Sequence, residues 1–191
     1  MNQILSVFFN EPLKQHYFRE IVRKSRISPN IVQAKLKKLI NNKQIMYRGK
    51  QGNMKFYVAD RDNQSFINMK KLYNLEQIYK TKLLEKLDEL LSPNAIILFG
   101  SYCQGFDTES SDIDLLVVVE KYSQIPPEAL KNFEHQLNRK INLHIVQDFS
   151  GLNPELKNNM LNGTLLHGYI RVFDARDIPH TKGSGKGKSI D

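Results

Sequence analysis

The sequence predicts an α+β protein in which a basic, helical N-terminal part precedes a mixed sheet flanked by helices. Two observations lead to this prediction. Residues 1–91 hold 18 Lys and Arg against 8 Asp and Glu and show apolar residues at helical spacing, whereas residues 92–179 hold 7 against 11 and contain apolar runs of strand length. The basic part is expected to bind a polyanion. The acidic part is expected to bind a metal cation together with a ligand of that cation.

Three helices are expected within the first 41 residues. An apolar helix over residues 2–9 stops before Pro12, and a second runs from about residue 13 or 16 to residue 25. Ser28 as N-cap with Pro29 at the first helical position starts a third helix over residues 29–41. The apolar stripe of this third helix leaves polar and basic side chains facing outward.

A basic hairpin should follow, with strands over residues 44–48 and 55–58 around a Gly-containing loop. Three helices and such a hairpin resemble a winged helix-turn-helix DNA-binding domain over about residues 1–60. The resemblance implies that the third helix enters the major groove and that the wing contacts the DNA backbone. It places Asn30, Gln33 and Lys37 at base edges, and Lys35, Lys38, Arg48, Lys50 and Lys55 at phosphates. A protein-binding module with a solvated lysine face is the alternative.

A long helix is expected over residues 62–91, which contain neither Gly nor Pro. Its apolar stripe consists of Leu72, Leu75, Tyr79, Leu83, Leu87 and Leu90. The stripe is interpreted as packing that joins the two parts of the chain, and a homodimer seam is the alternative. Ser92-Pro93-Asn94 ends this helix.

The most informative stretch is residues 96–119, where an apolar run ends in Gly100-Ser101 and Asp112 and Asp114 open a second apolar run. Strand side chains alternate, so the two aspartates share one face. Adjacent carboxylates repel each other unless a cation neutralises them, and hard oxygen ligands suit Mg²⁺ or Mn²⁺. Gly100 lets a phosphate approach the backbone, and Ser101 offers a hydroxyl and an N–H. The pattern indicates a metal-dependent phosphate site; the alternative is that the aspartates merely cap a strand edge.

Gly100-Ser101, ten residues, then Asp112-x-Asp114 resembles the signature of the DNA polymerase beta-like nucleotidyltransferases, most closely their minimal members, over about residues 93–169. The resemblance implies that Gly100 and Ser101 bind an NTP, expected to be ATP, and that Asp112 and Asp114 are catalytic metal ligands. It implies transfer of NMP, expected to be AMP, to a hydroxyl. Minimal members are often antitoxins that modify a HEPN-type toxin, so a HEPN-type protein is a candidate partner and acceptor.

The strand expected over residues 140–146 departs from this family, whose active members usually carry a third acidic residue there. Ile141, Leu143 and Ile145 take one face, which leaves Asn142 and His144 on the other. Asn142 is the expected occupant of the third-acid position. His144 is the alternative, since it could ligate a metal or accept a proton, although a single His on a strand is more often a hydrogen-bonded structural residue. Two functions therefore stay open: an antitoxin-like, DNA-binding nucleotidyltransferase, or a DNA-binding transcriptional regulator whose nucleotidyltransferase-like domain binds nucleotide or a partner without catalysis.

The remaining features complete the expected organisation. A helix over residues 126–138 precedes the third strand of the sheet, and a helix from residue 153 to 162 precedes a closing segment over residues 163–169. The expected domains are residues 1–60, a linking helix over 61–92, residues 93–178, and a disordered tail over 179–191. No apolar run approaches the roughly 18–20 residues of a membrane helix, so a soluble, cytoplasmic protein without a membrane partner is expected. The single cysteine, Cys103, excludes an internal disulfide.

Overall fold

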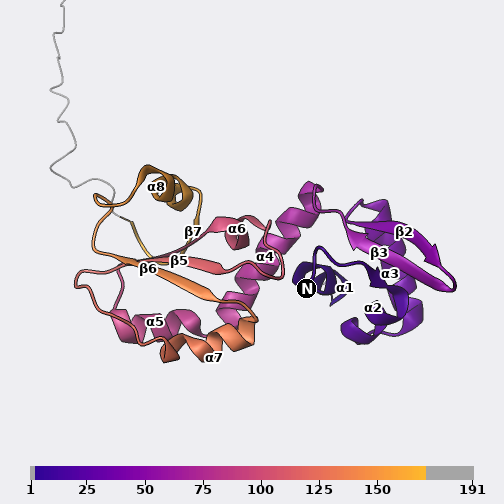
Figure 1. Ribbon diagram of the computed structural model, residues 1–191, viewed down its shortest axis with the longest axis horizontal. Helices are drawn as coiled ribbons and strands as arrows, with labels where there is room; N and C mark the ends of the chain where they lie inside the picture. Colours follow the sequence, from indigo (N-terminus) through magenta and orange to yellow (C-terminus); the bar gives the residue numbers. More distant parts are fainter. Residues whose placement is uncertain (1–2, 171–191) are drawn as a thin grey trace, which may run out of the picture.

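The computed structural model describes residues 3–170, which form two units (Figure 1). One hydrophobic cluster is the core of the N-terminal unit, and one cluster lies on each face of the sheet of the second unit. The N-terminal unit, residues 3–59, contains α1 (Gln3–Asn10), β1 (His16–Tyr17), α2 (Phe18–Ser25), α3 (Pro29–Asn41), β2 (Ile45–Gln51) and β3 (Met54–Ala59). The second unit contains α4 (Gln64–Lys80), α5 (Leu83–Leu91), β4 (Ala95–Phe99), α6 (Gly100–Gln104), β5 (Ile113–Val118), α7 (Glu128–Leu137), β6 (Ile141–Val146), α8 (Pro154–Leu161) and β7 (Thr164–Gly168). The predicted α+β class is confirmed.

The N-terminal unit packs its three helices against an antiparallel sheet of order β1-β3-β2. Its core includes Phe8 of α1, Ile21 of α2 and Leu36 of α3, all of which are buried. Helix α3 begins and ends where the sequence predicts, with Ser28 at the N-cap in extended conformation, although the Ser28 side chain makes no capping hydrogen bond. Burial of its apolar stripe therefore positions α3, and its opposite face is left to solvent.

Two details of this unit differ from the prediction. His16 and Tyr17 belong to a short strand that pairs with Tyr57 and Phe56 of β3, so the second helix starts only at Phe18. The hairpin strands are also longer than predicted and reach Gln51 and Met54, with a bulge between Tyr47 and Gly49. Inter-strand hydrogen bonds, which sequence periodicity does not report, account for both differences.

The prediction of a single helix over residues 62–91 is wrong, because the helix is interrupted between α4 and α5. The Thr81 hydroxyl donates to the backbone carbonyl of Ile78 at 2.7 Å, and Lys82 takes a left-handed conformation with φ 60°. This local side-chain bond competes with helix continuation. The predicted apolar stripe is wrong within α4 as well, since Leu72 and Tyr79 are exposed and the buried residues of this helix are Phe66, Ile67, Lys70, Asn74 and Ile78.

Helix α4 nevertheless connects the two units. Phe66, near its beginning, packs in the core of the N-terminal unit, and Ile78, near its end, packs in the core of the second unit. Figure 1 shows α4 running between the two groups of elements. The division of the chain at residues 60, 92 and 178 stays a prediction.

The second sheet is mixed, with strand order β6-β5-β4-β7 and one parallel pair, β5 with β6. Leu98 and Leu115 face a core shared with α5 and α7, whereas Ile97 and Leu116 face Met160 of α8. Helices thus cover both faces, with α5 and α7 on one side and α8 on the other (Figure 1). The predicted tail over residues 179–191 lies outside the described residues, and within residues 3–170 no helix is long and apolar enough to cross a membrane.

Candidate active site

The glycine and aspartate ends of the predicted motif meet where β4 ends. Phe99, the last residue of β4, pairs in register with Asp114 of β5, and Gly100 follows with φ 73°. A Cβ atom on Gly100 would lie 2.6 Å from the Oδ2 atom of Asp114. Any other residue would therefore be strained and would collide with this carboxylate. The Gly100 backbone and the Asp114 carboxylate are in contact only because position 100 has no side chain, and half-buried Ser101 follows in α6.

The two aspartates lie beside Asn142 on the neighbouring parallel strand. Asp114 and Asn142 are register partners of β5 and β6. The Asn142 Nδ2 atom donates to Asp112 Oδ2 at 3.2 Å and to Asp114 Oδ1 at 3.1 Å. The amide thus spans both carboxylates from the position that the sequence interpretation gives to the third acid.

His144 is placed differently. It lies two residues beyond Asn142 on β6, opposite Leu116, and its side chain is exposed. Its ring packs against the ring of Phe99 with a centroid separation of 5.4 Å. Asn142 rather than His144 is therefore the β6 residue that contacts the aspartate pair.

The donor set fits a hard divalent cation. Asp112 and Asp114 present carboxylate oxygens at the beginning of the interior strand β5, and the Asn142 amide can rotate so that its carbonyl oxygen faces them. Mg²⁺ and Mn²⁺ prefer such oxygen ligands and are commonly held by one or two carboxylates plus substrate phosphates. Asp112 and Asp114 would hold the ion next to the Gly100-Ser101 turn, because the Asp114 carboxylate fills the space that a side chain at position 100 would need.

A buried polar network holds the loop between Gly100 and Asp112, and sequence reasoning missed it. Asp107 and Lys70 are each only 1% exposed, and the Lys70 ammonium lies 3.1 Å from Asp107 Oδ1. Lys70 also donates to the Asp107 backbone carbonyl. The Asn74 Nδ2 atom donates to Asp107 Oδ1 and to the Tyr102 carbonyl, both at 2.8 Å. Helix α4 thereby anchors both α6 and the loop that leads to the aspartates.

The charges of this network are strongly affected by burial. Burial raises the pKa of the Asp107 carboxyl, against the opposing effect of the Lys70 ammonium and the Asn74 amide. Burial likewise lowers the pKa of Lys70. The Arg139 guanidinium lies 3.8 Å from Asp107 Oδ2 and adds a second cation. One signal was available in the sequence: Lys70 and Asn74 are one helical turn apart, in line with Phe66 and Ile78.

The residues proposed from the sequence to contact DNA are exposed on the N-terminal unit. Asn30, Gln33 and Lys37 of α3 line a shallow hollow together with Lys55 of β3. Arg48 and Lys50 lie on β2, and Lys35 and Lys38 project from α3. Helix α3 lies beside the β2–β3 hairpin (Figure 1), and the hollow between α3 and β3 brings Asn30, Gln33, Lys37 and Lys55 together.

A mixed sheet that brings a Gly-Ser turn against an Asp-x-Asp strand is the arrangement expected of nucleotidyl transfer enzymes. The family model described as "Nucleotidyltransferase domain" matches residues 80–175, about half of the chain. The chain belongs to this nucleotidyltransferase domain family. The match begins at the end of α4, so it includes the whole second sheet and leaves the N-terminal unit outside.

A crystal structure of a mutant MntA–HpeT toxin–antitoxin complex is similar to this chain, with 25% sequence identity and a TM-score of 0.36. The similarity covers 47% of this chain and 72% of that one. No match was found among curated proteins.

Proposed function

We propose that this protein is a metal-dependent nucleotidyltransferase that transfers NMP from an NTP, expected to be AMP from ATP, to a hydroxyl. The observation that supports it most is the close approach of the Asp114 carboxylate to Gly100, since it places a potential metal ligand beside the Gly100-Ser101 turn that would hold the triphosphate. The family match is consistent with this chemistry. The alternative, in which Asp112 and Asp114 merely cap a strand edge, gives no reason for both carboxylates to accept from one amide.

Each residue of the candidate site has its own role in such a reaction. Gly100 and Ser101 hold the triphosphate, and Asp112 and Asp114 hold Mg²⁺ or Mn²⁺. The bound metal would neutralise charge at the α-phosphate and stabilise leaving pyrophosphate. Asn142 orients the two carboxylates through its amide but cannot accept a proton from the attacking hydroxyl as a carboxylate could.

Replacing Asp114 by asparagine tests this proposal. Transfer of α-labelled ATP into host lysate in the presence of Mg²⁺ or Mn²⁺ should fall at least roughly 100-fold, because metal charge stabilisation contributes several kcal/mol. Asp62→Asn is the matched control, since Asp62 is exposed and lies before α4. Equal labelling by Asp114→Asn and wild type would contradict the site assignment. Metal-dependent ATP binding without any transfer would instead support the regulator alternative.

We further propose that the N-terminal unit is a winged helix-turn-helix that binds DNA, as both candidate functions require. Its support is the exposed surface formed by α3 and the hairpin, with polar side chains on the helix and basic ones on both elements. Asn30, Gln33 and Lys37 would contact bases, and the lysines and Arg48 of the same surface would contact phosphates. Under the second candidate, favoured by Asn142 in place of a carboxylate, DNA binding is regulated by nucleotide or partner without catalysis.

DNA binding should depend steeply on salt, because phosphate contacts release counterions. The double substitution Lys38→Ala with Lys50→Ala removes two side chains placed at phosphates and should reduce the slope of log affinity against log salt by roughly 1 to 2. Exposed Lys131 of α7, which lies in the second unit, gives the control Lys131→Ala with an unchanged slope. Fluorescence anisotropy of labelled duplex DNA over a salt series measures the affinity at each salt concentration and therefore the slope. Binding that does not vary with salt would rule out this surface as a phosphate-binding one.

The acceptor and the assembly are the finer parts of this proposal. A hydroxyl of a HEPN-type protein is proposed as acceptor on the sequence resemblance alone. A homodimer is proposed through the apolar residues of α4 and α5 that remain exposed, Leu72, Tyr79 and Leu90.

A further inference from the structure

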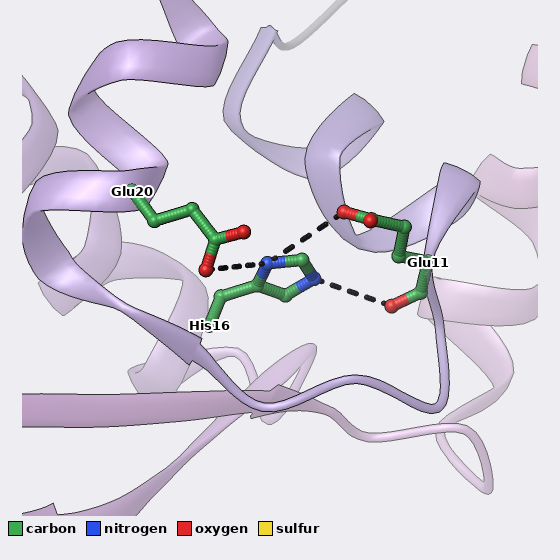
Figure 2. A group of neighbouring side chains, drawn as sticks. All are labelled: Glu11, His16 and Glu20. Atoms are coloured by element: carbon green, nitrogen blue, oxygen red, sulfur yellow. Dashed lines mark hydrogen bonds and ion pairs between the residues drawn. The ribbon is translucent and has the colours of Figure 1, made fainter.

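Three side chains that can ligate a metal meet where α1, β1 and α2 join, far along the chain from Asp112 and Asp114 (Figure 2). Glu11 follows α1, His16 begins β1, and Glu20 lies in the first turn of α2. The His16 Nδ1 atom is 3.5 Å from Glu20 Oε2 and 3.9 Å from Glu11 Oε2. Figure 2 shows both carboxylates directed at this side of the imidazole ring.

The protonation of His16 leaves a lone pair between these carboxylates. Its Nε2 atom lies 3.2 Å from the Glu11 backbone carbonyl, which can only accept, so Nε2 carries the hydrogen. Burial lowers the pKa of His16, which keeps the ring neutral near pH 7. Nδ1 then carries a lone pair and faces two carboxylates, which are also hydrogen-bond acceptors. It is completely buried and has no hydrogen-bond partner among residues 3–170.

The ring of His16 is held in this orientation. Its edge contacts the Phe8 ring with a centroid separation of 5.0 Å and an interplanar angle of 76°. The residue is also fixed by strand pairing, since its register partner is Tyr57 of β3. An imidazole with one nitrogen bonded to a backbone carbonyl and the other directed at carboxylates has the outer support that metal-bound histidines usually have.

Two lysines neutralise the carboxylates without satisfying Nδ1. Lys14 Nζ lies 2.8 Å from Glu20 Oε1 and 3.3 Å from Glu11 Oε1, while Lys24 pairs with Glu11 and lies 3.1 Å from Glu20 Oε1. Burial alone would raise the pKa of Glu20, but these hydrogen bonds lower it to about 2. The lysine side chains are 46% and 30% exposed, so the ammonium groups that a metal ion would displace, including that of Lys24 from Glu11 Oε2, have access to water.

We propose that Glu11, His16 and Glu20 bind Zn²⁺ or a similar divalent transition metal. Two ligands on one tetrahedral Zn²⁺ lie roughly 3.4 Å apart, which is close to the separations of Nδ1 from both carboxylates. A ligand set of one imidazole and two carboxylates favours Zn²⁺ or a similar transition metal over Mg²⁺, because Mg²⁺ prefers oxygen ligands alone. Water would take the fourth position, and the metal would tie the end of α1 to β1 and α2. Helices α1 and α2 both pack against α3.

The test is a Zn²⁺ titration of the metal-stripped, full-length protein against a fluorescent chelator, with millimolar Mg²⁺ present to occupy Asp112 and Asp114. The expected result is one equivalent of Zn²⁺, bound at least about 10-fold more weakly by Glu11→Gln and by Glu20→Gln. Glu76→Gln is the matched control, since Glu76 also pairs with a lysine but lies outside the cluster. Lys14→Met with Lys24→Met should tighten binding, because it removes the competing ammonium groups.

Buried His16 requires a separate readout, because His16→Gln can unfold the unit. The visible absorption of bound Co²⁺ should show a tetrahedral site with a nitrogen ligand in the wild type, which reports imidazole coordination without any substitution. Absence of Zn²⁺ binding, or equal affinity in wild type, Glu11→Gln and Glu20→Gln, would overturn the proposal and leave an ion-pair cluster. Neither readout uses nucleotide transfer, so the outcome is independent of the proposed function.

Discussion

Asp107→Ala should lower the free energy of unfolding by roughly 3–5 kcal/mol, because it leaves the buried Lys70 ammonium without its counterion. Asp107 and Lys70 are both almost completely buried, and the Asn74 amide loses a partner in the same substitution. Nucleotide transfer should fall as well, because Asp107 lies in the loop that carries Asp112. Denaturant unfolding followed by circular dichroism measures the stability change.

A double substitution separates the buried charge from the packing. Lys70→Met with Asp107→Leu should be less destabilising than Asp107→Ala alone, because it removes both charges and fills the space. The control is Glu76→Gln, which breaks the exposed ion pair with Lys80 and should change stability little. If Asp107→Ala resembled that control, the network would not hold the site loop.

The same network shows what the sequence could not predict about the fold. Helical spacing correctly predicted α3, whose buried face is uniformly apolar. On α4 the buried face includes Lys70 and Asn74, and their partner Asp107 is 37 and 33 residues away. Periodicity therefore placed Leu72 and Tyr79 in the apolar stripe predicted to be buried, whereas both side chains are exposed. A buried charge is compatible with a helix face only through a distant partner, which no local pattern reports.

The candidate site was more accessible to sequence reasoning, because its residues lie on strands with regular alternation. Alternation placed Asp112 and Asp114 together and put Asn142 on the same side of the next strand, where the structure has it. The space that Gly100 leaves for the Asp114 carboxylate needs the antiparallel register of β4 with β5, which follows only from the assembled sheet.

Asn142→Asp should strengthen divalent metal binding on the order of 10-fold, because it adds a carboxylate where the amide now contacts both aspartates. Without metal, the same substitution should instead lower the stability of the fold. Three carboxylates would repel one another, and the two hydrogen bonds donated by the amide would be lost. The variant should therefore be less stable than wild type in chelator and should regain stability with Mg²⁺. Thermal unfolding over a Mg²⁺ series measures both effects.

Two further variants determine what Asn142 does in the natural protein. Asn159→Asp adds the same charge on exposed α8 and should leave the Mg²⁺ dependence unchanged, whereas Asn142→Ala removes the amide without adding charge. If Asn142→Asp raises both metal affinity and nucleotide transfer, the amide limits a working nucleotidyltransferase. If metal affinity rises while transfer stays absent, the family site in this chain holds nucleotide for the regulator function. An unchanged metal affinity would mean that Asp112 and Asp114 do not bind the metal, since a third carboxylate in contact with both must alter any ion they hold.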